Sequence, residues 1–148
     1  MKARRRARRL TLEILYEYDI AGHTPGEVLQ RRLDEQPLER AVSEFVGQLL
    51  FGVVGIQEQM DILIARYAPE WPLEQMAIID RNILRIAIYE FLVDGSTPTK
   101  VAINEAVELA KMYGSDSAPR FINGVLGTLA EQSDSLRQEL LISPQPVI

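Results

Sequence analysis

Apolar residues recur at intervals of three and four through nearly the whole chain, which is the spacing of one face of an α-helix. In the first such segment, Leu10, Ile14 and Tyr18 follow this spacing. No segment alternates apolar and polar residues over the length of a strand between hairpin turns, so a sheet is not expected. The pattern therefore predicts an all-α fold of about seven helices.

Glycine and proline residues interrupt this pattern and set the expected helix boundaries. Gly22 ends the first helix, and Thr24 and Pro25 then supply an N-cap followed by a proline in the first turn. Pro69 and Pro72 end a long central helix, because proline disfavours the helical conformation at the residue before it. The predicted helices span residues 7–20, 25–35, 37–67, 73–92, 99–112, 117–129 and 134–141.

The length of 148 residues is that of one ordinary domain, which is long enough to bury a sizeable core. The two prolines after residue 68 mark a junction inside this domain. We expect an N-terminal subdomain of about residues 1–68 and a C-terminal subdomain of about residues 72–142. The segment from Ser143 to Pro146 is expected to fray.

The sequence shows no recognisable catalytic motif, and its abundant carboxylates are interpreted as structural. The chain contains no cysteine, which excludes disulfides and thiolate metal sites. The single histidine, His23, lies in a Gly-His-Thr-Pro turn with no second imidazole, so we interpret it as a surface residue. No glycine-rich turn runs into Lys-Ser or Lys-Thr, as a phosphate-binding loop would. We therefore predict no catalytic residue, no cofactor and no metal site.

The longest uncharged stretch runs from Phe45 to Gln57 and contains three glycines, which makes it too short and too interrupted to cross a bilayer. The basic N-terminus lacks the apolar core that follows the charges of a secretory signal. We therefore expect a cytoplasmic protein with no membrane partner.

Charge is distributed very unevenly along the chain. The net charge is −5, from 16 Lys and Arg residues against 21 Asp and Glu residues. Six of the basic residues lie within the first nine positions, where no acid occurs, so the rest of the chain is strongly acidic. Closely spaced guanidinium groups bind phosphate oxygens and release condensed counterions from a nucleic acid. The basic segment of residues 2–9 therefore predicts that one end of the protein binds a polyanion such as a nucleic acid. The alternative is that this segment is a solvated tail that only aids solubility.

Two further pairs of residues leave more than one interpretation open. Arg120 and Phe121 follow a helix start, where a cation beside an aromatic ring can hold a phosphate and stack an unpaired base. The alternative is that Phe121 belongs to the core. Tyr16 and Tyr18 point to different sides of a helix, so one of them should be exposed or at an interface. Composition alone does not distinguish RNA from DNA.

Three sequence blocks stand out in the second half of the chain. They are ILRIAIYE at residues 83–90, VAINEAVELAK at 101–111 followed by Tyr113 and Gly114, and RFINGVL at 120–126. Together with the arginine-rich start that runs into Leu15 and Tyr16, these blocks resemble the NusB family. The resemblance covers residues 2–131 in order, and the chain departs from the family pattern at residues 117–119 and around His23.

This resemblance implies a fold of two orthogonally packed three-helix bundles with no catalytic activity. It implies a transcription antitermination factor that acts on ribosomal RNA operons within the RNA polymerase antitermination complex. The implied partners are single-stranded boxA-type RNA and the small-subunit ribosomal protein called NusE. Whether the free protein forms a homodimer stays open.

The resemblance also implies two sets of contact residues when its motifs are matched position by position. The RNA contacts would be Lys2, Arg4, Arg5, Arg6, Arg8, Arg9, Arg85, Arg120 and Phe121. The contacts with the ribosomal protein would be Tyr16, Ile20, Asp80 and Tyr113.

Two other functions fit a helical domain of this kind. One is a protein-interaction or dimerisation module whose arginines are incidental. The other is the RNA-binding accessory domain of an RNA methyltransferase, which would require a cofactor-binding α/β region with a glycine-rich turn after a strand. The sequence contains no such turn.

Overall fold

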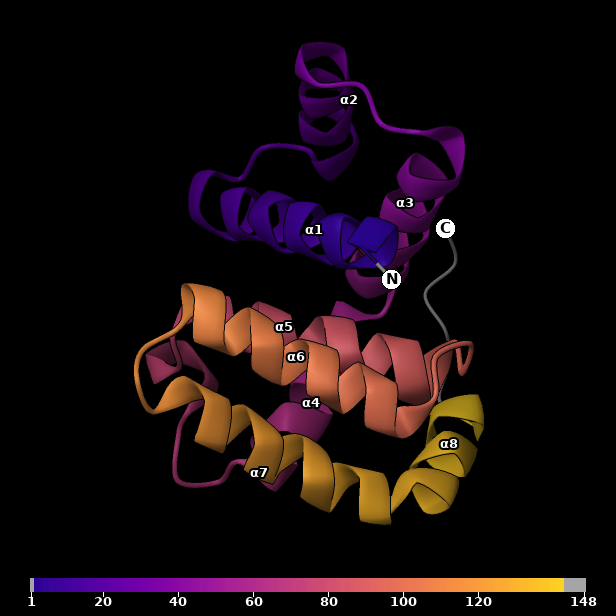
Figure 1. The fold of residues 1–148 in the computed structure, drawn as a ribbon. Coiled ribbons are helices and arrows are strands. Elements are labelled where there is room, and N and C mark those ends of the chain that lie inside the picture. Colours follow the sequence, from indigo (N-terminus) through magenta and orange to yellow (C-terminus); the bar gives the residue numbers. More distant parts are fainter. Residues whose placement is uncertain (1, 143–148) are drawn as a thin grey trace.

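The computed structural model describes residues 2–142, which form helices joined by short connections (Figure 1). The α-helices are α1 (Lys2–Ala21), α2 (Pro25–Glu35), α3 (Arg40–Gly55), α4 (Gln57–Tyr67), α5 (Ile78–Ile88), α6 (Thr99–Tyr113), α7 (Ala118–Glu131) and α8 (Ser133–Ile142). A 3₁₀ turn, η1 (Leu73–Gln75), precedes α5, and a π-helical turn, η2 (Tyr89–Val93), follows it. No strand occurs among these residues, which confirms the predicted all-α class.

The helix boundaries follow the predicted ones except in the middle of the chain. The predicted central helix 37–67 is two helices, because the backbone at Ile56 leaves the helical region with φ −127° and ψ 27°. The predicted helix 73–92 is divided into η1, α5 and η2, since Met76 and Ala77 have extended ψ angles of 139° and 135°. Residues 2–142 therefore contain eight α-helices, where about seven were predicted.

The helices form two groups, which lie one above the other in Figure 1. The upper group contains α1, α2 and α3, and α1 packs on α3. The lower group contains α4 to α8, in which α6 packs on α5 and α7, and α4 packs on the same two helices. Helix α1 also packs on α5 and so joins the two groups.

One continuous cluster of buried apolar side chains runs through both groups. Leu12 and Leu15 of α1 and Ile83 of α5 are fully buried in it, and burying each such side chain contributes about 1.5–3 kcal/mol. Helix α3 approaches η2 so closely at Gly52 that a Cβ atom there would lie 2.3 Å from the Tyr89 ring. Glycine at this position therefore allows the two groups to meet.

Within residues 2–142, no helix is both long enough and apolar enough to span a bilayer. The uncharged stretch from Phe45 to Gln57 instead forms most of α3 and the start of α4. The predicted frayed segment, residues 143–146, lies outside the described residues.

Candidate nucleic-acid interface

The arginine-rich start forms the first turns of α1, which begins at Lys2 instead of the predicted residue 7. Arginine and the interspersed alanines are good helix formers. Lys2, Arg4, Arg5 and Arg6 are exposed. No acid lies in this first turn, so the cations stand at the positive end of the helix dipole, which costs about 0.3–1 kcal/mol each. An anionic ligand would relieve this repulsion.

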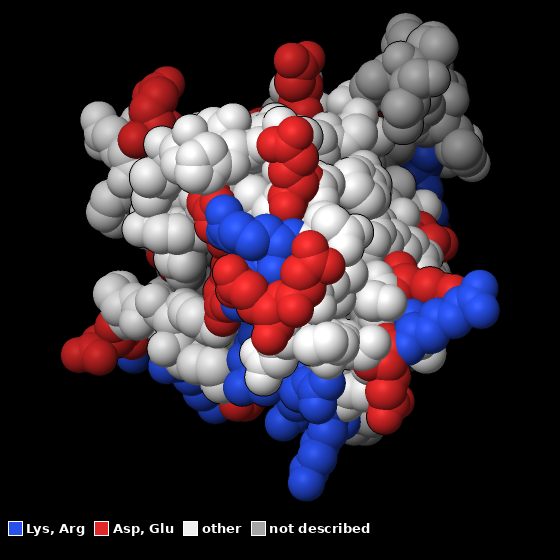
Figure 2. Space-filling view, turned by 90° about the horizontal axis from the view of Figure 1, so that it is seen from above, with Lys and Arg blue, Asp and Glu red and all other residues white. Residues whose placement is uncertain are grey.

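Basic side chains gather on one side of the molecule. In the view from above, several of the visible Lys and Arg side chains gather along the lower edge, which is the side that faces the viewer in Figure 1 (Figure 2). Acidic side chains project from much of the remaining outline. A protein of net charge −5 therefore carries a concentrated positive region beside the start of α1.

Contacts within the protein orient two of the exposed arginines. Arg5 Nε donates to Glu105 Oε1 at 3.0 Å, although the Arg5 side chain stays 55% exposed. The guanidinium carbon of Arg4 lies 4.3 Å from the centroid of the Phe45 ring. Arg6 has no hydrogen-bond or ion-pair partner in the part of the chain that the structure describes. Pre-oriented cations lose less side-chain freedom when they bind a phosphate.

Arg8 differs from its neighbours because its side chain is buried. Its Nε donates to Glu90 Oε2 at 2.9 Å and its Nη2 to Glu90 Oε1 at 2.7 Å. Thr97 Oγ1 donates to the same carboxylate at 2.8 Å. The structure therefore gives Arg8 an internal partner on η2, and not the surface position expected of an RNA contact.

Arg85, the RNA contact expected on α5, is also buried. Its Nε and Nη2 donate to the two carboxylate oxygens of Asp61, each at 2.8 Å, and its Nη1 donates to Asp19 Oδ2 at 3.0 Å. This network links α5 to α4 and α1 and leaves no free face of the guanidinium for RNA. A signal for this was present in the sequence, because Arg85 stands in an apolar run, where a charge is buried only if it is paired.

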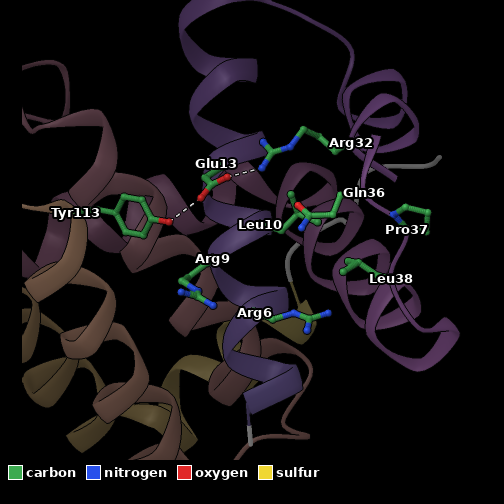
Figure 3. A pocket seen from close by; sticks show the side chains of 9 residues that line it. All are labelled: Arg6, Arg9, Leu10, Glu13, Arg32, Gln36, Pro37, Leu38 and Tyr113. Carbon is green, nitrogen blue, oxygen red and sulfur yellow. Dashed lines mark hydrogen bonds and ion pairs between the residues drawn. The ribbon is translucent and has the colours of Figure 1, made fainter. Parts of the chain in front are cut away.

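A hollow of about 460 Å³, here called the α1–α2 hollow, lies between α1, α2 and the end of α6 (Figure 3). In it, Glu13 accepts hydrogen bonds from Arg32 at 2.5 Å and from the Tyr113 hydroxyl at 2.6 Å. The lining residues are Arg6, Arg9, Leu10, Glu13, Arg32, Gln36, Pro37, Leu38 and Tyr113.

These contacts set the protonation states of Glu13 and Tyr113. Burial alone would raise the pKa of Glu13, but the hydrogen bonds from Arg32 and Tyr113, together with the charges of Arg32 and Arg9, outweigh burial and lower that pKa below its ordinary 4.5. Burial, together with the Glu13 carboxylate, raises the pKa of Tyr113 to about 12. Glu13 is therefore ionised at neutral pH, and the Tyr113 hydroxyl keeps the proton that it donates.

A second hollow, here called the α1–α6 groove, separates the first turns of α1 from α6. Arg6 and Arg9 line both this groove and the α1–α2 hollow. Met112 in the groove is well exposed. The groove residues are Lys2, Arg5, Arg6, Arg8 and Arg9 of α1, with Glu105, Glu108, Leu109 and Met112 of α6.

Arg120 and Phe121 lie in the first turn of α7 and line a third hollow. Arg120 is exposed, and Phe121 is half-buried and packs against the core, so neither alternative from the sequence describes its ring completely. Trp71, which was not among the predicted functional residues, lines the same hollow and is 53% exposed. An aromatic residue inside a proline-rich connection was the signal for an exposed ring.

The residues expected at a protein partner lie on α1, α5 and α6. Tyr16 and Ile20 are one turn apart on α1 and are 38% and 55% exposed, whereas Tyr18 is half-buried. Asp80 is partly buried at the start of α5, and its Oδ1 has no hydrogen-bond partner among residues 2–142. Burial raises the pKa of Asp80 above its ordinary value. Tyr113 belongs to the α1–α2 hollow.

The chemistry available on these surfaces is anion and aromatic binding. In the described part of the chain, no group of three or more His, Cys, Asp or Glu side chains is placed to hold a metal ion. His23 is exposed, and its Nδ1 lies 2.7 Å from Glu17 Oε2. The cations of α1, by contrast, lie beside two hollows that open to solvent.

Comparison with known proteins identifies the family. A family model described as the NusB family matches residues 5–131. The chain belongs to the NusB family. One NusB relative, the transcription antitermination protein NusB of Dehalococcoides mccartyi strain 195, is 45% identical over 137 residues, which cover 92% of this chain and 96% of the relative. The protein of the same description from Roseiflexus sp. strain RS-1 is 47% identical over 131 residues, covering 87% and 92% of the two chains.

Solved NusB structures share the fold. A crystal form of NusB from T. maritima superposes with a TM-score of 0.82 at 31% identity, covering 92% of this chain and 96% of that one. A crystal structure of the antitermination factors NusB and NusE in complex with dsRNA superposes with a TM-score of 0.80 at 26% identity, covering 88% and 98%. The predicted NusB-like fold is thereby confirmed.

Proposed function

We propose that this NusB-family protein is a non-catalytic transcription antitermination factor that binds single-stranded boxA-type RNA of ribosomal RNA operons. The observation that carries the proposal is the group of exposed cations on the first turns of α1 in an otherwise acidic protein. Relatives named transcription antitermination protein NusB, and a NusB structure that contains RNA, support it.

The proposed RNA surface is centred on the start of α1. The exposed guanidinium groups there suit phosphate oxygens, and the half-buried Arg9 extends the same positive region. Arg120 and Phe121 would add a cation and a partly exposed ring on which an unpaired base can stack. Arg8 and Arg85 are assigned a structural role, because their side chains are buried and paired with carboxylates within the protein. The proposed RNA contacts are Lys2, Arg4, Arg5, Arg6, Arg9, Arg120 and Phe121.

The proposed protein partner is the small-subunit ribosomal protein NusE, which occurs with NusB in one of the similar solved structures. Tyr16 and Ile20 offer an exposed apolar strip near the end of α1. Asn82 donates to Asp19 at 2.8 Å, which brings the start of α5, and with it Asp80, beside that end. The Asp80 carboxylate as a whole is only partly buried, and it would accept a hydrogen bond from the partner.

The proposed mechanism is assembly, with no bond made or broken by this protein. The RNA contacts of α1 supply a salt-sensitive attraction that carries little sequence information. Once NusE is bound beside them, its own RNA contacts become effectively intramolecular, and the joint affinity rises. The resulting complex in the cytoplasm would then join RNA polymerase in the antitermination complex.

The test is a titration of a fluorescent boxA-type RNA followed by anisotropy at several salt concentrations, with and without NusE. The six proposed cationic contacts on a single strand predict a slope of about −4 in a plot of log affinity against log salt. NusE should raise the affinity. An affinity that does not change with salt would contradict the proposed surface. A separate assay addresses the methyltransferase alternative: incubation of the protein with RNA and a methyl donor should give no methylated product.

A further inference from the structure

The α1–α2 hollow carries an excess of positive charge. Arg6, Arg9 and Arg32 line it, and Glu13 is its only acid. The Glu13 carboxylate is already occupied by Arg32 and Tyr113. Neither Arg6 nor Arg9 has a hydrogen-bonded or ion-paired partner within residues 2–142. The hollow therefore carries more positive than negative charge, although Arg9 acts electrostatically on Glu13 and helps to lower its pKa.

The same hollow has an apolar wall. Leu10 of α1 and the Pro37-Leu38 segment that follows α2 line it, and Leu10 and Leu38 also touch the core. Gln36 beside them carries both a hydrogen-bond donor and an acceptor. A volume of about 460 Å³ falls within the range of sites for small organic groups. Cations beside an apolar wall and one amide suit a nucleotide better than they suit an inorganic ion.

The hollow is continuous with the proposed RNA surface. Arg6 and Arg9 line this hollow and also line the α1–α6 groove. The first turns of α1 therefore form a ridge between the hollow and the groove. In Figure 3, Arg6 and Arg9 extend apart from each other, with Arg9 on the side of Tyr113. Two separated cations suit two successive phosphates of a strand, whereas a single phosphate would need them to converge.

We propose that the α1–α2 hollow is a subsite for one nucleotide of the bound RNA strand, which extends the proposed function beyond the arginines of α1. The phosphates on either side of this nucleotide lie on Arg6 and Arg9. The base lies against Leu10 and Leu38, where the Gln36 amide meets its polar edge. This inference rests on the proposed RNA binding.

Glu13, Arg32 and Tyr113 have a positioning role in this subsite. A bare carboxylate in the hollow would repel the phosphates. Arg32 and Tyr113 prevent this, because they neutralise and hydrogen-bond Glu13, whose lowered pKa shows that its charge is stabilised. Tyr113, expected from the resemblance at the protein partner, is thus assigned to the RNA side.

The test uses the absence of cysteine from the natural chain. Gln36→Cys places a single thiol at the exposed rim of the hollow, and Ser135→Cys places one on the exposed surface of α8, which lies far from α2 in Figure 1. The rate of alkylation of each thiol is measured in the full-length protein with and without saturating boxA-type RNA. Anisotropy on the same samples verifies that RNA is bound. Parallel samples contain AMP or inorganic phosphate instead of RNA.

We expect bound RNA to slow alkylation of the Gln36→Cys thiol at least five-fold and to leave the Ser135→Cys thiol unaffected. Bound RNA with an unchanged rate at position 36 would overturn the subsite and leave the proposed function intact. Equal protection by AMP or phosphate alone would also overturn it, in favour of a site for free nucleotides or anions. Failure of the unsubstituted protein to bind RNA would overturn the proposed function and this inference with it.

Discussion

Arg8 of α1 and Glu90 of η2 form a two-pronged ion pair in the interior, with side chains only 3% and 2% exposed. Thr97 donates a third hydrogen bond to the same carboxylate. This contact joins the first turns of α1 to the lower group of helices, and Arg85 with Asp19 joins the far end of α1 to that group. Two buried ion pairs, one near each end of α1, thus hold this helix against the lower group. They thereby set the direction in which the exposed arginines of α1 point.

We predict that Glu90→Ala lowers the free energy of unfolding by about 3–5 kcal/mol, because it leaves the Arg8 charge buried without a partner. Urea denaturation followed by circular dichroism measures this. The double variant Arg8→Met with Glu90→Leu should recover most of the loss, since it removes both charges and keeps the volume filled. A matched control, Glu44→Ala, breaks the exposed pair with Arg40 and should cost less than about 1 kcal/mol. Equal losses at Glu90 and Glu44 would contradict the buried-pair argument.

We predict that Arg6→Ala weakens RNA binding and makes the slope of log affinity against log salt shallower by about 0.7, the value for one lost phosphate contact on a single strand. Anisotropy titrations over a range of salt concentrations measure both quantities. The control is Arg40→Ala, which removes an exposed arginine from the start of α3. If both variants changed the slope equally, RNA would be responding to net charge and not to the start of α1.

Arg32 and Arg31 are neighbours on α2 with different partners, and this makes them a matched pair. Arg32 binds Glu13 inside the α1–α2 hollow, whereas Arg31 binds Glu17 outside it. We predict that Arg32→Gln lowers RNA affinity roughly five- to ten-fold, which corresponds to about 1–1.4 kcal/mol, because it exposes the phosphates to a Glu13 carboxylate that has lost its ion pair. Arg31→Gln should have little effect. Similar losses for the two variants would argue against a role for the hollow.

The sequence predicted the features that depend on neighbouring residues, such as helix bounds, better than those that depend on contacts between residues far apart in the chain. The helix Pro25–Glu35 was predicted with its observed bounds, because a local proline and periodicity define it. The break at Ile56 was missed, since no proline marks it. The partner of Arg8 lies 82 positions away and that of Tyr113 lies 100 away, so these pairings depend on how the two groups pack. A run of arginines predicts a charged surface but not which member turns inward.

Asp80 gives a prediction in which stability and binding change in opposite directions. Burial raises its pKa in the folded protein above the ordinary 3.8, so the ionised carboxylate destabilises the fold at neutral pH. The penalty is fully present above the folded pKa and disappears as the pH falls below 3.8, where the carboxyl is protonated in both folded and unfolded chains.

Asp80→Asn should therefore raise the urea midpoint at pH 7, and this gain should shrink as the pH is lowered toward 3.8. The same variant should weaken binding of NusE, because the charged, partly buried Asp80 carboxylate is the acceptor proposed for the partner. Calorimetric titration with NusE measures the second effect, and Asp116→Asn, at an exposed acid between α6 and α7, serves as the control. A variant that gained stability and kept full NusE affinity would show that Asp80 does not contact the partner. Loss of both would show that the carboxylate has a structural partner in solution. The combination of a stabler fold with weaker NusE binding is expected only if the buried charge is retained for the interface.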